Sequence, residues 1–211
     1  MKNVMSRTID YYFSLQSPWA YIGHRTFMDM VRRHNVKVTY KPIALSEVFA
    51  ETGGLPFAKR HPARLRYRIL ELQRWREKRG LKFNLHPKFW PFAAEAADRF
   101  AIAVAEAGHD PDPFLRRSFA ALWEEEQNLA DSTTLTALAN AITLPGPELL
   151  AQAERGETKA KYSRNSEDAI AAGVIGSPSY VLDGEVFWGQ DRLDLLDDAL
   201  RSGRKPYRFD I

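Results

Sequence analysis

The order of strand-like and helix-like segments is the feature that most constrains the fold of this chain. Residues 8–14 (TIDYYFS) are rich in aromatic residues and bounded by polar ones, which predicts a buried strand. Ser17 and Pro18 then offer an N-cap and a first-turn proline for a helix that continues to about His34. Residues 36–40 (VKVTY) predict a second strand. Such a βαβ unit is expected to have parallel strands and a right-handed crossover.

The middle of the chain has apolar residues at helical spacing. Helices are expected from about Leu65 to Gly80, over 93–107, from Pro113 to about Trp123, and over 132–142 and 147–172, the last broken near Gly156. Gly80 and Gly108 are expected to end the first two, and Asp112 with Pro113 to cap the third.

The C-terminal part is predicted to return to β structure. Residues 179–182 and 185–188, joined by Asp183 and Gly184, predict a hairpin. A last helix is expected over 191–200, with Asp191 as its N-cap.

This order of elements predicts an α/β, thioredoxin-like fold with an inserted all-helical domain. The expected thioredoxin-like domain comprises residues 1–45 and 174–211, and the helical insertion comprises residues 46–173. No internal repeat or low-complexity linker separates them.

The chain contains no cysteine, which excludes a disulfide, a cysteine nucleophile and a cysteine-based metal site. Its five histidines lack the spacing of a metal motif, so we expect no metal. There is no run of 18 apolar residues and no signal-like stretch in residues 1–7. We therefore expect a cytoplasmic protein that does not cross a membrane.

The basic charge is concentrated in one segment. Residues 59–82 hold ten Lys or Arg and two Glu, a balance of +8 in a chain of net charge +3, which leaves −5 elsewhere. A basic helix on an acidic body fits attraction of a small anion, binding of a phosphate backbone, or an ordinary solvated helix face.

Ser17 is the candidate catalytic residue. Its place after the first strand and at the start of the first helix puts it at the positive end of the helix dipole. There a hydroxyl can donate to a thiolate and lower the pKa of a bound thiol. The alternative is that Ser17 is simply an N-cap.

Ser177 and Pro178 directly precede the hairpin, where a proline is a candidate for a cis peptide. A cis bond would leave backbone groups of Ser177 free to pair with an extended peptide such as glutathione. An ordinary trans proline is the alternative. Asp191 is a candidate acceptor for a ligand ammonium group, or simply a helix cap.

Four segments resemble the 2-hydroxychromene-2-carboxylate isomerases, which belong with kappa-class glutathione transferases to the thioredoxin-like group related to DsbA. They are YYFSLQSPWAY (11–21), LQRW (72–75), FNLHPKFWP (83–91) and FWGQDRL (187–193). The resemblance spans residues 8–200.

This resemblance implies a glutathione-dependent isomerase that interconverts 2-hydroxychromene-2-carboxylate and trans-o-hydroxybenzylidenepyruvate. It implies that Ser17 contacts the glutathione sulfur, and that a small aromatic carboxylate is the substrate. It also implies a homodimer. Glutathione would be held by Ser17, Ser177, Pro178, Gln190 and Asp191, and the substrate pocket would be lined by Trp19, Asn84, Trp90 and basic residues of 59–82.

The sequence departs from the family pattern at Gly54, where relatives often carry asparagine; Lys59 is the expected substitute. Two other functions remain open. One is a kappa-like transferase that conjugates glutathione to electrophiles. The other is a non-catalytic adaptor that binds nucleic acid through residues 59–82, although the tryptophan and leucines of that segment favour a core-packed helix without a nucleic-acid partner.

Overall fold

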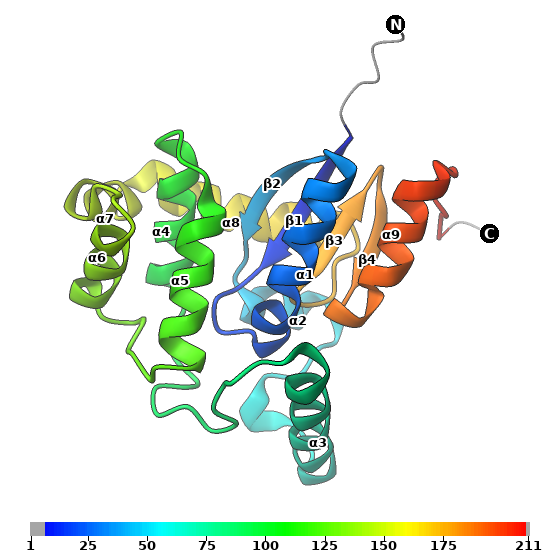
Figure 1. Ribbon diagram of the computed structural model, residues 1–211, viewed down its shortest axis with the longest axis horizontal. Coiled ribbons are helices and arrows are strands. Elements are labelled where there is room, and N and C mark those ends of the chain that lie inside the picture. Colours follow the sequence, from blue (N-terminus) through cyan, green and yellow to red (C-terminus); the bar gives the residue numbers. More distant parts are fainter. Residues whose placement is uncertain (1–6, 210–211) are drawn as a thin grey trace, which may run out of the picture.

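The computed structural model describes residues 7–209, and its centre is one four-stranded sheet (Figure 1). The strands are β1 (Thr8–Phe13), β2 (Lys37–Pro42), β3 (Ser179–Leu182) and β4 (Glu185–Trp188), in the order β2-β1-β3-β4. β1 pairs in parallel with β2 and antiparallel with β3, which pairs antiparallel with β4. The predicted βαβ unit and hairpin are therefore confirmed.

The helices range from 8 to 18 residues, and two short 3-10 turns accompany them. They are α1 (Pro18–His34), α2 (Leu45–Thr52), η1 (Phe57–Lys59), α3 (Pro62–Arg79), α4 (Glu95–Glu106), α5 (Pro111–Trp123), α6 (Ser132–Ala141), α7 (Gly146–Ala153), α8 (Gly156–Ala171), η2 (Gln190–Arg192) and α9 (Leu193–Ser202). In Figure 1, α1 and α9 lie in front of the sheet and α8 passes behind it, while α4 to α7 stand to one side and α3 below. Residues near Gly156 separate α7 from α8, as predicted.

Aromatic side chains of the sheet pack against α1. The rings of Tyr11 and Tyr180, on neighbouring strands, stack with centroids 5.3 Å apart, and Phe27 of α1 packs against both. These residues belong to the same buried cluster as Phe100 of α4 and Phe114 of α5. The thioredoxin-like fold carrying additional helices is thus confirmed, whereas the domain boundaries at residues 45 and 174 stay a prediction.

Two predicted helix caps are wrong. The N-cap of α5 is Asp110, which precedes Pro111, and not Asp112. The Asp112 carboxylate instead accepts from His24 Nε2 at 2.9 Å and from Arg116 Nε at 2.8 Å. Asp191 does not cap the last helix, because it lies within the 3-10 turn η2 and α9 begins at Leu193.

Some expectations fall partly outside the structure. Residues 1–6, from which the absence of a signal peptide was predicted, lie outside the described residues. Within residues 7–209, no helix is both long and apolar enough to span a bilayer.

Candidate functional site

Ser17 caps α1 at the carboxyl end of β1. Its Oγ accepts from the Ala20 N–H at 3.2 Å and donates to the carbonyl oxygen of Ser177 at 2.9 Å. The side chain is only 4% exposed. The predicted N-cap is confirmed, and the hydroxyl stands where the helix dipole favours an anion.

The Ser177–Pro178 peptide bond is cis, which decides between the two forms that the sequence left open. The Ser177 carbonyl is not free, because it accepts from Ser17, which differs from the sequence-based expectation. The Ser177 N–H has no recorded hydrogen-bond partner among the described residues. The Ser177 Oγ accepts from the Ser14 N–H at 3.1 Å, and the Pro178 carbonyl accepts from the Gly189 N–H at 2.8 Å. Hydrogen bonds thus join the turn before β3 to both the β1–α1 loop and the segment after β4.

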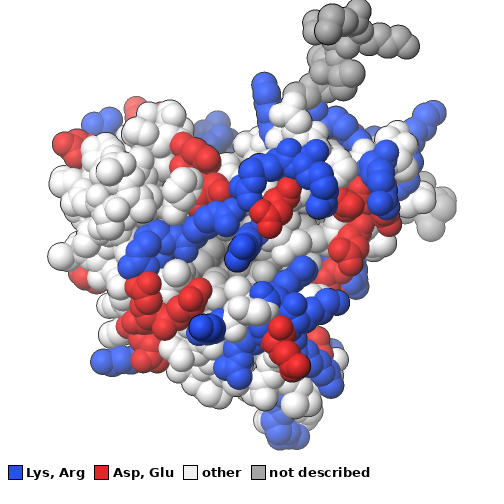
Figure 2. Space-filling view, viewed as in Figure 1, with Lys and Arg blue, Asp and Glu red and all other residues white. Residues whose placement is uncertain are grey.

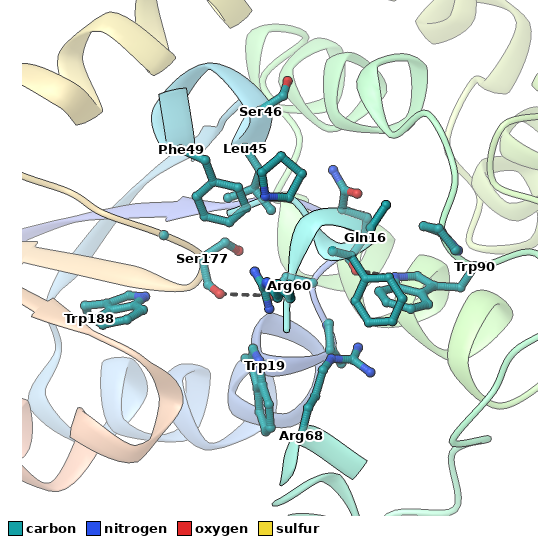
Figure 3. Close-up of a pocket in the computed structure, with 17 residues that line it drawn as sticks. Gln16, Trp19, Leu45, Ser46, Phe49, Arg60, Arg68, Trp90, Ser177 and Trp188 are labelled. Atoms are coloured by element: carbon teal, nitrogen blue, oxygen red, sulfur yellow. Dashed lines mark hydrogen bonds between the residues drawn. The ribbon is translucent and has the colours of Figure 1, made fainter. Parts of the chain in front are cut away.

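A pocket of about 370 Å³ opens beside Ser17 (Figure 3). Its volume suits a small organic ligand. The wall is largely apolar and aromatic, with contributions from five separate parts of the chain. The lining residues are Gln16, Ser17, Pro18, Trp19, Leu45, Ser46, Phe49, Pro56, Phe57, Ala58, Arg60, Arg68, Trp90, Pro91, Gly176, Ser177 and Trp188.

The cations of this pocket are Arg60, just after η1, and Arg68 of α3. The Arg68 guanidinium lies over the rings of Trp90, at 4.5 Å from the centroid, and Phe57, at 5.2 Å. Arg68 is only 8% exposed, and burial together with the charge of Arg60 lowers its pKa to about 10. No described carboxylate forms an ion pair with either arginine. The pocket therefore carries two positive charges without acidic partners.

A second pocket, of about 230 Å³, adjoins the first and shares Trp19, Ser177 and Trp188 with it. It is also lined by Glu71, Trp75, Gly189, Gln190, Asp191 and Arg192. Gln190 is buried, and its Oε1 accepts from Arg79 Nη2 at 3.2 Å. Asp191 is paired with Arg192 at 2.6 Å. The second pocket therefore contains carboxylates, each paired with an arginine, whereas the first has none.

The structure brings most of the predicted site residues together. Ser17, Trp90 and Ser177 line the first pocket, Gln190 and Asp191 the second, and Trp19 lies in both. Pro178 lines neither pocket, but its carbonyl accepts a hydrogen bond from Gly189, which lines the second.

Two predicted site residues lie elsewhere. Lys59 is exposed at the end of η1, and Asn84 follows α3 with its N–H donating to the Trp123 carbonyl at 2.7 Å. Neither lines a pocket. At Gly54 a Cβ atom would lie 2.4 Å from the Phe49 ring, so a side chain there requires that ring to move. The absence of a side chain at Gly54 therefore leaves room for the Phe49 ring in the pocket wall.

The sequence-based prediction does not single out Arg68, although its position relative to the apolar residues of α3 indicates that it faces inward. Arg68 lies three residues after Leu65 and four before Leu72, which places it on the apolar stripe of α3. A charged residue at an inward position of an amphipathic helix indicates a buried partner or a ligand. Asp98 is a similar case, between buried Ala94 and Ala101 on α4.

Asp98 anchors the loop that leads to Ser17. Its fully buried carboxylate accepts from Ser14 Oγ at 2.7 Å, from the Leu15 N–H at 2.8 Å and from Tyr162 Oη at 3.3 Å. Burial raises its pKa from 3.8 to about 7, despite these hydrogen bonds. A side chain of the helical segment therefore holds the β1–α1 loop.

The raised pKa of Asp98 predicts that the free energy of unfolding decreases as pH rises. In the unfolded chain Asp98 loses its proton near its ordinary pKa of 3.8, whereas in the folded protein it keeps the proton to about pH 7. Between these values the folded state binds the extra proton, so the free energy of unfolding decreases as pH rises, by about 2–4 kcal/mol. Asp98→Asn should remove this decrease, measured by urea unfolding at several pH values. Equal pH dependence in both proteins would contradict the assignment.

Comparison with known proteins identifies the family to which this fold belongs. The family model described as "DSBA-like thioredoxin domain" matches residues 8–201. A 2-hydroxychromene-2-carboxylate isomerase from Sphingobium xenophagum is 26% identical over 198 residues, 93% of this chain and 99% of that protein. Glutathione S-transferase kappa 1 from Caenorhabditis elegans is 24% identical, covering 92% of this chain and 90% of that protein. A solved structure of a 2-hydroxychromene-2-carboxylate isomerase has a TM-score of 0.77 at 21% identity, covering 92% and 95% of the two chains.

Proposed function

We propose that this chain, which belongs to the DSBA-like thioredoxin family, is a glutathione-dependent isomerase that interconverts 2-hydroxychromene-2-carboxylate and trans-o-hydroxybenzylidenepyruvate. The observation that carries the proposal is the Ser17 hydroxyl, at the start of α1 and beside a largely apolar pocket, in a chain without cysteine. Relatives named as this isomerase and as a kappa glutathione transferase support an enzyme of this kind.

Glutathione fits the residues that connect the two pockets. Both pockets include Ser177, whose N–H is available to an extended peptide. Its carbonyl, which accepts from Ser17 in this structure, would accept from the ligand instead. Gln190 and Asp191 in the second pocket supply acceptors for the γ-glutamyl ammonium group. Lys59 and Asn84 have no place in this arrangement, because neither lines a pocket.

Bound glutathione would supply a thiolate, whose reversible addition to a conjugated double bond permits rotation about that bond. The protein's part is to hold the sulfur and to favour its charged form. Ser17 Oγ, released from the Ser177 carbonyl, would donate to the sulfur, and the positive end of α1 would act in the same direction. Trp19 and Trp90 would provide flat apolar surfaces for the aromatic substrate.

The decisive experiment follows the ultraviolet spectrum of 2-hydroxychromene-2-carboxylate with purified protein, with and without glutathione. We expect equilibration of the two isomers only with glutathione, and an unchanged thiol concentration afterwards. Equilibration that is equally fast without glutathione would contradict the proposed cofactor. Absence of any change with glutathione present would contradict the isomerase.

A kappa-like transferase is the second candidate, favoured by the relative of that name. The same pockets would hold glutathione and an electrophile, and the product distinguishes the two functions. A transferase consumes the thiol and yields a stable thioether, whereas the isomerase returns it.

The geometry gives less support to a nucleic-acid adaptor. Figure 2 shows basic side chains gathered over α3 with acidic ones between them, which is not a continuous basic surface. Arg68 and Leu72 of that helix are buried. We also propose a cytoplasmic location, and a homodimer that size-exclusion chromatography with light scattering would test.

A further inference from the structure

The two arginines of the first pocket need an explanation that protein contacts do not give. A buried guanidinium without a carboxylate is unfavourable, because burial removes water from the charge. Arg68 is buried in this way, and the charge of Arg60 further disfavours its charged form. An apolar side chain at position 68 would pack against Trp90 and Phe57 without this penalty.

Both arginines have hydrogen-bond donors that no described residue uses. Arg60 uses its Nε to donate to the Leu55 carbonyl at 2.8 Å, and the structure records no hydrogen bond from its terminal nitrogens to described residues. It records none from Arg68, whose guanidinium is held flat by the two rings. Figure 3 shows Arg60 near the middle of the pocket and Arg68 close to Trp19. Planar guanidinium groups match the two oxygens of a carboxylate.

We propose that Arg60 and Arg68 bind the carboxylate end of the aromatic substrate. The inference rests on the proposed function and names two residues of the segment 59–82, whose basic residues were expected in the pocket only as a group. Two cations suit a 2-oxo carboxylate better than a simple carboxylate, since the keto oxygen gives a third acceptor beside the carboxylate pair. The aromatic end would then lie against the walls formed by Trp90 and Phe57.

Glutathione also has a carboxylate, at its glycyl end, so the two sources must be separated. The test measures binding of phenylpyruvate without glutathione, and of glutathione without phenylpyruvate, by calorimetry and by tryptophan fluorescence. The proteins are the unaltered chain, Arg60→Gln, Arg68→Met and the control Arg66→Gln. Arg66 is an exposed arginine of α3 that lines neither pocket.

We expect Arg60→Gln and Arg68→Met each to weaken phenylpyruvate binding by about tenfold or more, with glutathione binding and the control unchanged. The methyl ester of phenylpyruvate should bind weakly to all four proteins. Because Arg68→Met changes a buried position, its melting temperature is measured, and Arg60→Gln provides an independent test.

The other outcomes overturn the proposal. Loss of glutathione binding with phenylpyruvate binding retained would assign the arginines to the tripeptide. Unchanged binding of both ligands, or no binding of phenylpyruvate to the unaltered chain, would exclude a carboxylate site. These measurements contain no turnover, so they are independent of the isomerase assay and the two proposals can fail separately.

Discussion

Replacing Ser17 by alanine is expected to lower kcat/KM of the glutathione-dependent isomerisation by about 10- to 100-fold. A hydrogen bond to a charged group contributes about 1.5–3 kcal/mol, and the Ser17 hydroxyl is the donor proposed for the bound thiolate. Without it the thiol of the complex should titrate at higher pH, because the charged form loses a stabilising partner. The pH dependence of kcat should therefore move upward, a change that altered packing alone would not produce.

The same substitution removes a helix cap, which must be separated from the chemistry. Loss of the Ala20 N–H acceptor should lower the free energy of unfolding by about 1 kcal/mol. Asp131→Ala is a matched control, because Asp131 caps α6 by accepting from the Thr133 and Thr134 N–H groups and lines neither pocket. Its stability should fall similarly and its turnover should not. Ser17→Thr, which keeps a hydroxyl, should retain more activity than Ser17→Ala, and unchanged turnover in Ser17→Ala would remove Ser17 from the mechanism.

The sheet was predictable because its signals are local. Asp183 and Gly184 adopt positive φ angles of 52° and 85°, which is the conformation that an Asp-Gly hairpin turn favours. Ser17 with Pro18 likewise specifies a helix start through its own hydrogen bond and backbone angle. Such features depend only on adjacent residues, so the sequence alone predicts them.

Errors arose where two local readings compete. Asp110-Pro111 and Asp112-Pro113 are both valid helix starts, and the choice depends on His24 and Arg116, which bind the second aspartate. The sequence pattern predicts no helix or strand for residues 45–59, although they form α2 and η1 and supply Phe49 and Phe57 to the pocket. Only the tertiary arrangement gives those short elements their packing partners.

The site itself was predicted largely through family resemblance. Spacing along the chain does not indicate that Ser17, Arg68 and Trp188 line one pocket, because they lie on three distant segments. The resemblance placed Ser17, Ser177 and Trp90 but, among the basic residues of 59–82, did not single out Arg60 or Arg68. The placement of Arg60 and Arg68 in the pocket could therefore be found only from the structure.

Gly23 shows how closely α1 must approach the proposed glutathione-binding segment. A Cβ atom at Gly23 would lie 2.5 Å from the Cβ and 3.4 Å from the Cα of Gln190, positions that no flexible side-chain end can vacate. Gly23→Ala should therefore displace η2 and weaken glutathione binding by about tenfold or more. It should also lower the free energy of unfolding by about 1–3 kcal/mol, although alanine is the better helix former.

Gly156→Ala is the control for this substitution, because a Cβ at Gly156 would meet no atom within 4 Å. Its free energy of unfolding should stay equal or rise by up to about 1 kcal/mol, and its glutathione affinity should not change. Calorimetric titration with glutathione and urea unfolding measure both quantities on both variants. If Gly23→Ala binds glutathione as tightly as the unaltered chain, the segment around Gln190 does not hold the cofactor. If it binds weakly under conditions in which urea unfolding shows it to be folded, the contact between α1 and η2 positions that segment for the ligand, because general unfolding could not then account for the loss.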